Sequence, residues 1–397
     1  MKLGYFMNAG NLGLKKEMAQ VLDETREIVL YLEESDWDVI WFPEHHFGHE
    51  GYEVIPNPLM VSSDIGARTS RIRIGQAANI ITYWHPLRLA EDIALLDQLT
   101  KGRVEFGIGR GIYPREAMNL NPTADVRDSA TNRALFEETY EILLKALSNK
   151  FFSHKGKFYE FPYPGLEWRH RLSPHTPEFM DMKTAQITGV AVIPEPYQKP
   201  HPPISQVIDT PPSIKWAASQ KIQGLFWQPT VPELKNRFEL YREERSKAEG
   251  RDMPLGEGLG VLRDVYVADS MEQAEREAGE AVLAYFHWTC HFRGLGNMLL
   301  PGESLPPGGK LDPSTPGGKL DALTYEWLHP RNLLFGTPDY VAERIEEMRQ
   351  ELNLQTLLVG TSFPGLQHDK IMRSLKLFNE EVLPRVRGAK VRAAAAQ

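Results

Sequence analysis

The stretch Val39-Ile40-Trp41-Phe42-Pro43-Glu44-His45-His46-Phe47 joins four consecutive apolar residues to a polar group at their end. A short, uninterrupted apolar run is typical of a strand in a parallel sheet that is covered on both faces. Residues 15–34 before it and 58–67 after it carry apolar side chains at helical spacing. The stretch therefore predicts a parallel strand between two helices, with its polar residues at the carboxyl end of the strand.

The same alternation extends in both directions along the chain. Short apolar segments that predict strands lie at residues 2–7, 39–42, 72–75, 103–107, 204–208, 224–227, 260–267 and 355–360. Segments with helical periodicity lie at residues 15–34, 58–67, 86–99, 130–147, 213–219, 232–249, 271–287, 338–352 and 369–382. A count of about eight strand–helix pairs favours an α/β fold of the closed (β/α)8 TIM barrel type over an open sheet.

Two segments interrupt this alternation. Residues 151–203 are rich in proline and aromatic residues, and residues 290–325 contain the hexapeptide Pro-Gly-Gly-Lys-Leu-Asp twice. Proline and glycine do not sustain regular structure, so we expect long insertions there, with a mobile lid at 294–320. We expect residues 1–386 to form a single domain, followed by a flexible C-terminal tail at residues 387–397.

The composition is that of a globular protein and argues against several kinds of partner. The 397 residues are 42% hydrophobic and 25% charged, and the net charge is −8. A negative chain does not gather the phosphates of nucleic acid, and no apolar run approaches the roughly 20 residues that a membrane span needs. The single cysteine, Cys290, indicates a cytoplasmic location and cannot build a thiolate metal site. We expect no bound metal, and a buried, unreactive thiol at Cys290.

Glu44, His45 and His46 follow a strand, where the catalytic residues of a barrel are found. Adjacent residues of an extended chain point to opposite sides, so one histidine faces the site and the two do not easily share a metal ion. A histidine at this place can transfer a proton near neutral pH, or it can simply bond to a loop carbonyl. The residues alone leave both interpretations open.

Further candidates follow later strands. Residues 75–79 are mostly small and would let a planar ligand lie against the backbone, although simple packing explains them equally well. Arg110 follows the fourth strand, and its planar guanidinium suits phosphate or carbonyl oxygens. Thr210 and Ser213 open a helix, where they offer either a phosphate site or an ordinary helix cap.

Several short strings, taken together and in order, resemble those of the bacterial luciferase-like, flavin-dependent monooxygenase family, and in particular of its luciferase alpha subunits. They lie at residues 41–47, 85–92, 96–103, 107–113, 132–135, 215–218, 335–338 and 375–378. The resemblance covers most of the chain. It implies the same barrel fold and a homodimer.

By this resemblance the protein is an oxidoreductase that receives reduced FMN from a separate flavin reductase. Dioxygen adds to the reduced FMN, and the flavin hydroperoxide then oxygenates a small organic substrate by hydroxylation or Baeyer–Villiger insertion. The cofactor carries this chemistry, while the protein binds, orients and shields it. Two alternatives keep the fold, namely a deazaflavin-dependent hydride-transfer enzyme and a non-catalytic flavin-binding relative.

The resemblance also assigns roles to individual positions. His45 matches the catalytic histidine of the family, and the bond between Ala77 and Ala78 matches a non-proline cis peptide beside the flavin ring. Arg133, Thr210 and Ser213 fall where the family binds the FMN phosphate. The complete set of implied cofactor-binding residues is Ala77, Ala78, Arg110, Tyr113, Arg133, Thr210 and Ser213.

The substrate side is expected to differ from that of luciferase. We expect Glu44 and Trp227 to line the substrate pocket, although a position in the core would suit Trp227 equally well. Gly109 stands where the luciferase alpha subunit has a reactive cysteine. Light emission is therefore not expected, and we expect the two long insertions to shape the pocket.

Overall fold

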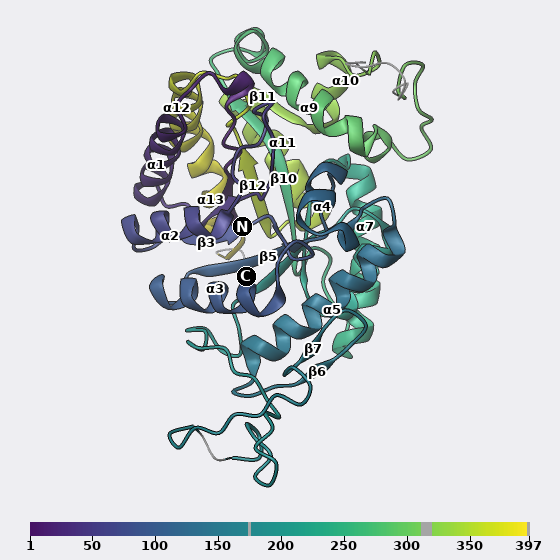
Figure 1. Cartoon of the computed structure of the whole chain (residues 1–397). Coiled ribbons are helices and arrows are strands. Elements are labelled where there is room, and N and C mark those ends of the chain that lie inside the picture. Colours follow the sequence, from purple (N-terminus) through teal and green to yellow (C-terminus); the bar gives the residue numbers. More distant parts are fainter. Residues whose placement is uncertain (174–175, 311–319, 395–397) are drawn as a thin grey trace.

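The computed structural model describes residues 1–173, 176–310 and 320–394. Its centre is a closed barrel of eight parallel strands, which confirms the predicted (β/α)8 fold (Figure 1). In order around the barrel they are β1 (Lys2–Phe6), β2 (Val39–Phe42), β3 (Arg73–Gln76), β5 (Val104–Gly109), β8 (Ile204–Val207), β9 (Gln223–Phe226), β10 (Leu259–Val267) and β12 (Thr356–Gly360). Each strand pairs with the next, and β12 pairs with β1 to close the ring.

Helices surround the barrel, as the helical periodicity predicts, and the one at Glu280–Arg293 reaches over its carboxyl end. They are α1 (Met18–Glu34), α2 (Pro58–Arg68), α3 (Pro86–Leu99), α5 (Ser129–Ser148), α6 (Pro211–Ser219), α7 (Val231–Glu249), α8 (Met271–Ala274), α9 (Glu280–Arg293), α11 (Pro338–Leu352) and α12 (His368–Leu377). Local chemistry sets their starts. In α2, for example, a proline opens the helix after Asn57, whose side chain accepts backbone N–H groups of the first turn.

Short elements that the sequence pattern did not indicate complete the fold. They are β4 (Asn79–Ile80), α4 (Pro114–Leu120), α10 (Tyr325–Asn332) and β11 (Leu333–Gly336). Strand β11 pairs with the end of β10, which also contacts β9 and β12. These short elements stand outside the regular alternation of strand and helix, so their context in the folded chain determines them.

The amino end of the barrel is filled by charged side chains. Glu105 is buried, and its Oε1 atom lies 2.6 Å from Nζ of Lys2 and 2.6 Å from Nε of Arg73. These residues come from the beginnings of β5, β1 and β3. The carboxyl end is therefore the face that can receive a ligand, as in other barrels of this type.

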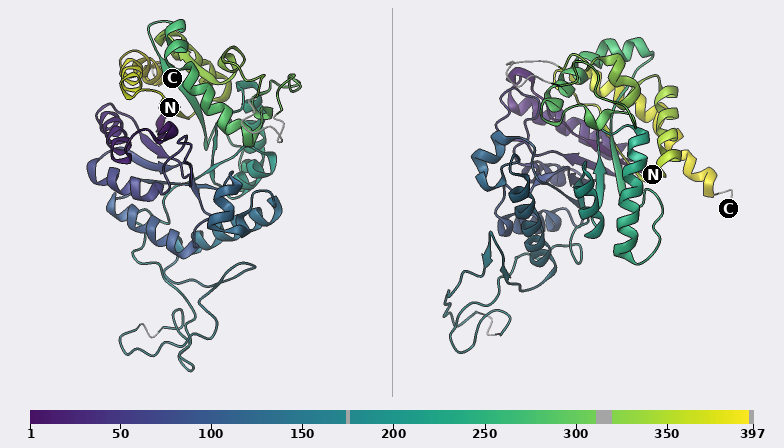
Figure 2. Two further views of the ribbon diagram at one scale, coloured as in Figure 1. Left: turned by 45° about the horizontal axis from the view of Figure 1, so that its top comes forward. Right: turned by 90° about the vertical axis from the view of Figure 1, so that its right-hand side faces the viewer.

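The insertion at 151–203 is mostly irregular, as expected, apart from a hairpin of β6 (His154–Lys155) and β7 (Glu160–Phe161). The carboxylate of Glu138 in α5 accepts backbone N–H groups from residues 157–159 and so anchors the hairpin to the barrel. Beyond the hairpin, the insertion projects from the side of α3 and α5, away from α9 and α10 (Figures 1 and 2).

The second insertion is partly packed into the protein. Leu295 and Met298 are buried, and a short 3-10 turn spans Gly296–Met298. The predicted lid at 294–320 is therefore anchored at its beginning, while residues 311–319 lie outside the described residues. At the C-terminus, helix α13 (Leu383–Ala394) occupies most of the segment that we expect to be a flexible tail. Across the described ranges, no helix combines the length and the apolar character that crossing a bilayer requires.

Candidate active site

A small cavity of about 80 Å³ lies inside the carboxyl end of the barrel. Its walls come from strand ends and from α9, and they include Pro43, His45, Ala77, Tyr113, Trp227 and Tyr285. We call it the inner cavity. It is smaller than the several hundred Å³ that small-molecule sites usually occupy.

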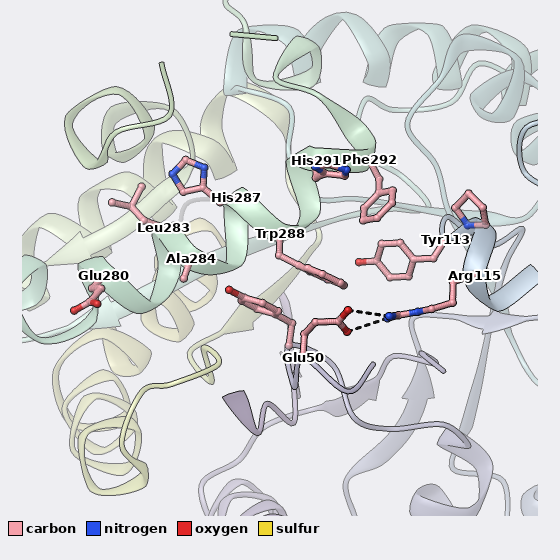
Figure 3. Close-up of a pocket in the computed structure, with 12 residues that line it drawn as sticks. Glu50, Tyr113, Arg115, Glu280, Leu283, Ala284, His287, Trp288, His291 and Phe292 are labelled. Atoms are coloured by element: carbon pink, nitrogen blue, oxygen red, sulfur yellow. Dashed lines mark hydrogen bonds and ion pairs between the residues drawn. The ribbon is translucent and has the colours of Figure 1, made fainter. Parts of the chain in front are cut away.

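A larger cleft of about 780 Å³ lies outside the inner cavity, between α9, the start of α4 and the loop after β2 (Figure 3). We call it the outer cleft. Its walls are largely aromatic, with Tyr52 stacked on Trp288 at 5.0 Å between ring centroids and 8° between planes. A bidentate ion pair joins Arg115 to Glu50 at 2.8 and 3.0 Å. Tyr113 lines both spaces, so its ring is a wall between them.

His45 lies at this wall, with both ring nitrogens facing carboxylates. Its Nδ1 atom is 3.3 Å from Oε1 of Glu116, and its Nε2 atom is 3.3 Å from Oε1 of Glu53. Burial opposes a charge on the ring, but the surrounding carboxylates outweigh this effect and raise the pKa of His45. His45 therefore faces the inner cavity in a position to hold a proton.

Glu53 is buried and links three aromatic side chains. Its Oε2 atom accepts the hydroxyl of Tyr113 at 2.9 Å, and its Oε1 atom accepts the hydroxyl of Tyr285 at 3.2 Å. Burial, together with the negative charge of Glu53, raises the pKa of both phenols well above their ordinary value. Both tyrosines therefore remain protonated donors, and the Glu53 carboxylate is fixed from two elements of the fold.

Glu44 and His46 contact each other and are not among the residues that line the inner cavity. The carboxylate of Glu44 accepts the backbone N–H of Ile80 at 2.9 Å, the indole N–H of Trp84 at 3.0 Å and a contact from Nε2 of His46 at 2.9 Å. With all of these partners, the buried carboxylate points away from the inner cavity. The expectation that Glu44 lines the substrate pocket is therefore corrected, whereas His46 supports the fold as expected.

The peptide bond between Ala77 and Ala78 is cis, as the resemblance implies. Ala77 lines the inner cavity. Here the end of β3 approaches β5 closely, since a Cβ atom at Gly107 would lie 1.5 Å from the carbonyl oxygen of Gln76. Glycine at 107 is therefore what allows this close approach of the two strands.

Two arginines lie close together, Arg110 directly after β5 and Arg133 near the start of α5. Burial and then the positive charge of Arg133 lower the pKa of the Arg110 guanidinium. Arg110 donates to Asn132 at 3.2 Å, and Arg133 is 3.7 Å from Glu137. Glu137 is the acidic residue that acts on both guanidinium groups, so two cations against one carboxylate leave a net positive charge, which suits an anion such as phosphate.

Thr210 and Ser213 form a reciprocal cap at the start of α6, in which the Thr210 backbone N–H donates to Oγ of Ser213 at 3.1 Å. The ordinary cap that the sequence left open is thus present. Helices α5 and α6 pack together through Trp216, whose ring lies 5.1 Å from that of Phe136. One turn earlier on each helix stand Arg133 and Ser213, so the start of α6 lies on the same side of the barrel as the two arginines.

Trp227 lines the inner cavity, and its role in binding the substrate stays a prediction. Its ring packs on Tyr285 and lies under the guanidinium of Arg293, 5.7 Å from the ring centroid. Arg293 in turn pairs with Asp209 at 2.6 Å. These contacts fasten the end of α9 to the ends of β8 and β9.

Cys290 is buried, and burial raises the pKa of its thiol to about 12. The prediction of a buried thiol is confirmed, and the raised pKa agrees with low reactivity. Within residues 1–173, 176–310 and 320–394, no group of three or more histidine, cysteine or acidic side chains is placed to hold a metal ion.

The sequence interpretation missed Glu53, Glu116, Tyr285 and Arg293. Glu53 and Glu116 lie in a loop and in a short helix, neither of which has a readable period. One signal was available for Glu53, because a carboxylate between Tyr52 and Val54 is flanked by side chains that favour burial. Tyr285 and Arg293 belong to α9, and the sequence pattern alone does not show which side of this helix faces the inner cavity.

Both a family model and individual proteins of known name match this chain in sequence. A model of the luciferase-like monooxygenase family matches residues 1–355. The oxygenase component of flavin-dependent trigonelline monooxygenase from Acinetobacter baylyi is 25% identical over 304 residues, which cover 74% of this chain and 72% of that protein. The alkanal monooxygenase alpha chain of Photorhabdus luminescens is 25% identical over 357 residues, covering 89% of this chain and 88% of that one.

Solved structures share the fold. The FMN complex of the oxygenating constituent of 3,6-diketocamphane monooxygenase from Pseudomonas putida aligns with a TM-score of 0.74 and 22% identity, over 97% of this chain and 98% of that one. An F420-dependent secondary alcohol dehydrogenase aligns with a TM-score of 0.65 and 16% identity, over 97% and 98%. Because the family match spans nearly all of the barrel, the chain belongs to the luciferase-like monooxygenase family.

Proposed function

We propose that the protein is the oxygenase component of a two-component system. It takes reduced FMN from a separate flavin reductase and uses dioxygen to oxygenate a small organic substrate, by hydroxylation or Baeyer–Villiger insertion. The observation that carries this proposal is the pair of neighbouring cations, Arg110 and Arg133, on the face of the barrel that also holds His45. The family relatives that are named for flavin support it.

The residues at this face fit FMN. Arg110 and Arg133 would hold the phosphate, with the amino end of α6 at Thr210 and Ser213 beside them. Near Ala77 the small side chains and the closely packed backbone of β3 and β5 would let the planar ring lie against the backbone. When bound, reduced FMN passes electrons to dioxygen and so supplies the oxidising power of the reaction.

The protein's own part is to handle protons and to exclude water. His45 holds a proton beside the inner cavity, and Tyr113 separates this position from the outer cleft. The cleft has the volume of a small-molecule site and is mostly aromatic, so we propose that the organic substrate approaches through it. A homodimer and a single-domain organisation also stay predictions.

The decisive experiment mixes the protein with reduced FMN without oxygen, admits dioxygen and records the flavin absorbance over time. We expect reoxidation to follow a course distinct from that of free FMN, because the protein shields the bound cofactor. A course identical to free FMN, together with tight binding of a deazaflavin, would favour the hydride-transfer alternative. Lack of binding to either cofactor would favour a non-catalytic relative.

Substrate class can be surveyed in the same assay. Decanal, trigonelline and 3,6-diketocamphane represent the chemistries for which the relatives are named. Product analysis by mass spectrometry after supply of reduced FMN would identify incorporation of one oxygen atom from labelled dioxygen.

A further inference from the structure

We propose that Glu53 is a positioning residue that, together with Glu116, holds His45 in its doubly protonated form with one proton directed at the inner cavity. His45 then enters the reaction as a proton donor and a fixed positive charge. The inference about catalysis rests on the proposed monooxygenase function, whereas the protonation state rests on the geometry alone.

The two ring nitrogens of His45 provide the first argument. Each lies 3.3 Å from a carboxylate oxygen, Nδ1 from Glu116 and Nε2 from Glu53. A neutral imidazole carries one N–H and one lone pair, so one nitrogen would turn its lone pair toward a carboxylate. In the imidazolium, Nδ1–H donates to Glu116, and the charge of the ring attracts the Glu53 carboxylate that lies 3.3 Å from Nε2.

Burial strengthens the electrostatic interaction between His45 and the two carboxylates. The side chain of His45 is 15% exposed, and those of Glu53 and Glu116 are 7% and 1% exposed. Water therefore screens the three charges weakly, and the attraction between the ring and the carboxylates is stronger than at the surface. The raised pKa of His45 agrees in direction with this balance.

The other charged groups around His45 are already paired. Glu44, from the same strand end, is bound by His46 at 2.9 Å. The charge of Arg293 in α9 also acts on Glu53, but its guanidinium pairs with Asp209 at 2.6 Å. The phenols of Tyr113 and Tyr285 are neutral donors, so neither carries a charge that would compete for Glu53.

Glu53 is also held in place more firmly than a typical loop carboxylate. Tyr113, directly before α4, donates to one oxygen, and Tyr285 in α9 donates to the other. Glu116 is fixed by the backbone N–H of His46 at 2.7 Å. Glu116 therefore fixes the ring through its contact with Nδ1, and the held carboxylate of Glu53 stabilises the positive charge beside Nε2, whose proton is the one that faces the inner cavity.

The test is a titration of His45 by nuclear magnetic resonance in protein with isotope-labelled histidine and no added flavin. His45→Gln assigns the signal by its loss. We expect the midpoint of the wild-type titration to lie above that of free histidine, and Glu53→Gln to lower it by about one to three pH units. Glu50→Gln is the matched control, because Glu50 lies on the same loop but pairs with Arg115, and the midpoint should not move.

Glu53→Asp is a second variant, in case Glu53→Gln does not fold. It keeps the carboxylate charge but moves it away from His45 by the length of one methylene group. It should give a midpoint between those of the wild type and Glu53→Gln. A wild-type midpoint at the value of free histidine, or equal midpoints in the wild type and a folded Glu53→Gln or Glu53→Asp protein, would overturn the proposal.

A second readout links the titration to catalysis. In Glu53→Gln the pH at which oxygenation declines on the alkaline side should fall together with the His45 midpoint, while FMN binding is retained. Normal oxygenation without the His45 shift contradicts this inference and leaves the proposed function standing. A shifted His45 in a protein that never oxygenates contradicts the proposed function instead.

Discussion

The indole Nε1 atom of Trp227 donates a hydrogen bond of 2.8 Å to Oδ2 of Asp264, and this carboxyl group is buried within the barrel. Burial raises the pKa of Asp264 from 3.8 to about 7. The neighbouring Arg263 is also buried, its guanidinium donates to the backbone carbonyls of Trp227 and Pro229, and burial lowers its pKa to about 10. A titrating acid thus supports one wall of the inner cavity.

Replacing Asp264 by asparagine should change how stability depends on pH. Between about pH 4 and pH 7 the folded protein keeps a proton that the unfolded chain has lost. This contribution to stability is complete at low pH and disappears as the pH rises through about 7. Relative to the wild type, Asp264→Asn should therefore gain up to a few kcal/mol between pH 4.5 and pH 8, measured by urea unfolding.

The exposed residue Asp269 supplies the control for this experiment. Asp269→Asn should follow the wild-type curve at every pH. If the stability difference between Asp264→Asn and the wild type is the same at pH 4.5 and pH 8, the raised pKa of Asp264 is refuted.

Arg133→Ala should weaken FMN binding by roughly 10- to 100-fold, because a charge-assisted hydrogen bond contributes about 1.5–3 kcal/mol. Quenching of flavin fluorescence measures the dissociation constant. Riboflavin lacks the phosphate, so its affinity should be nearly the same in the variant and the wild type. Arg127→Ala, which removes an exposed arginine paired with Asp125, should leave FMN binding unchanged. An FMN affinity that survives the loss of Arg133 would rule out this residue as a phosphate ligand.

His45→Ala should still bind FMN but should lose the coupling between flavin oxidation and product formation. A positioned proton-transfer group typically contributes about 10²- to 10⁴-fold in rate. The measurement is the ratio of oxygenated product to hydrogen peroxide, with the substrate that the survey identifies. A ratio equal to that of the wild type would remove His45 from the chemistry.

Gly107→Ala should destabilise the barrel by about 1–3 kcal/mol or more, because the new methyl group would overlap the carbonyl oxygen of Gln76. Gly296→Ala is the control, since a Cβ atom there meets no neighbour within 4 Å. Urea unfolding should separate the two variants clearly. Equal midpoints would mean that β3 and β5 can separate without cost.

The barrel was predictable from the sequence because long elements repeat their pattern. Strand β2 and helices α3 and α11 begin and end at the expected residues. Helix α4 was not predictable, since its seven residues make fewer than two full turns, and β11 was missed because it stands outside the strand–helix alternation and, among the described strands, pairs only with the end of β10.

The candidate site was predicted where a residue follows a strand, and it was missed or misplaced elsewhere. His45, Ala77 and Trp227 follow strands and line the inner cavity. Glu44 follows the same strand as His45, but successive side chains alternate in direction, so its carboxylate points to Ile80 and Trp84. Glu53 reaches the site through an irregular loop, whose path no local pattern specifies.

The ring of Tyr113 borders both the inner cavity and the outer cleft, and this has a consequence for laboratory evolution. Leu283 and His291 border the outer cleft, and Trp227 borders the inner cavity, so each of these positions can be varied to reshape one space. Among the described lining residues, Tyr113 belongs to both sets, and its hydroxyl is bonded to Glu53. Under the proposed function, a library that varies position 113 changes substrate room and proton supply together, so these two traits cannot be selected independently there.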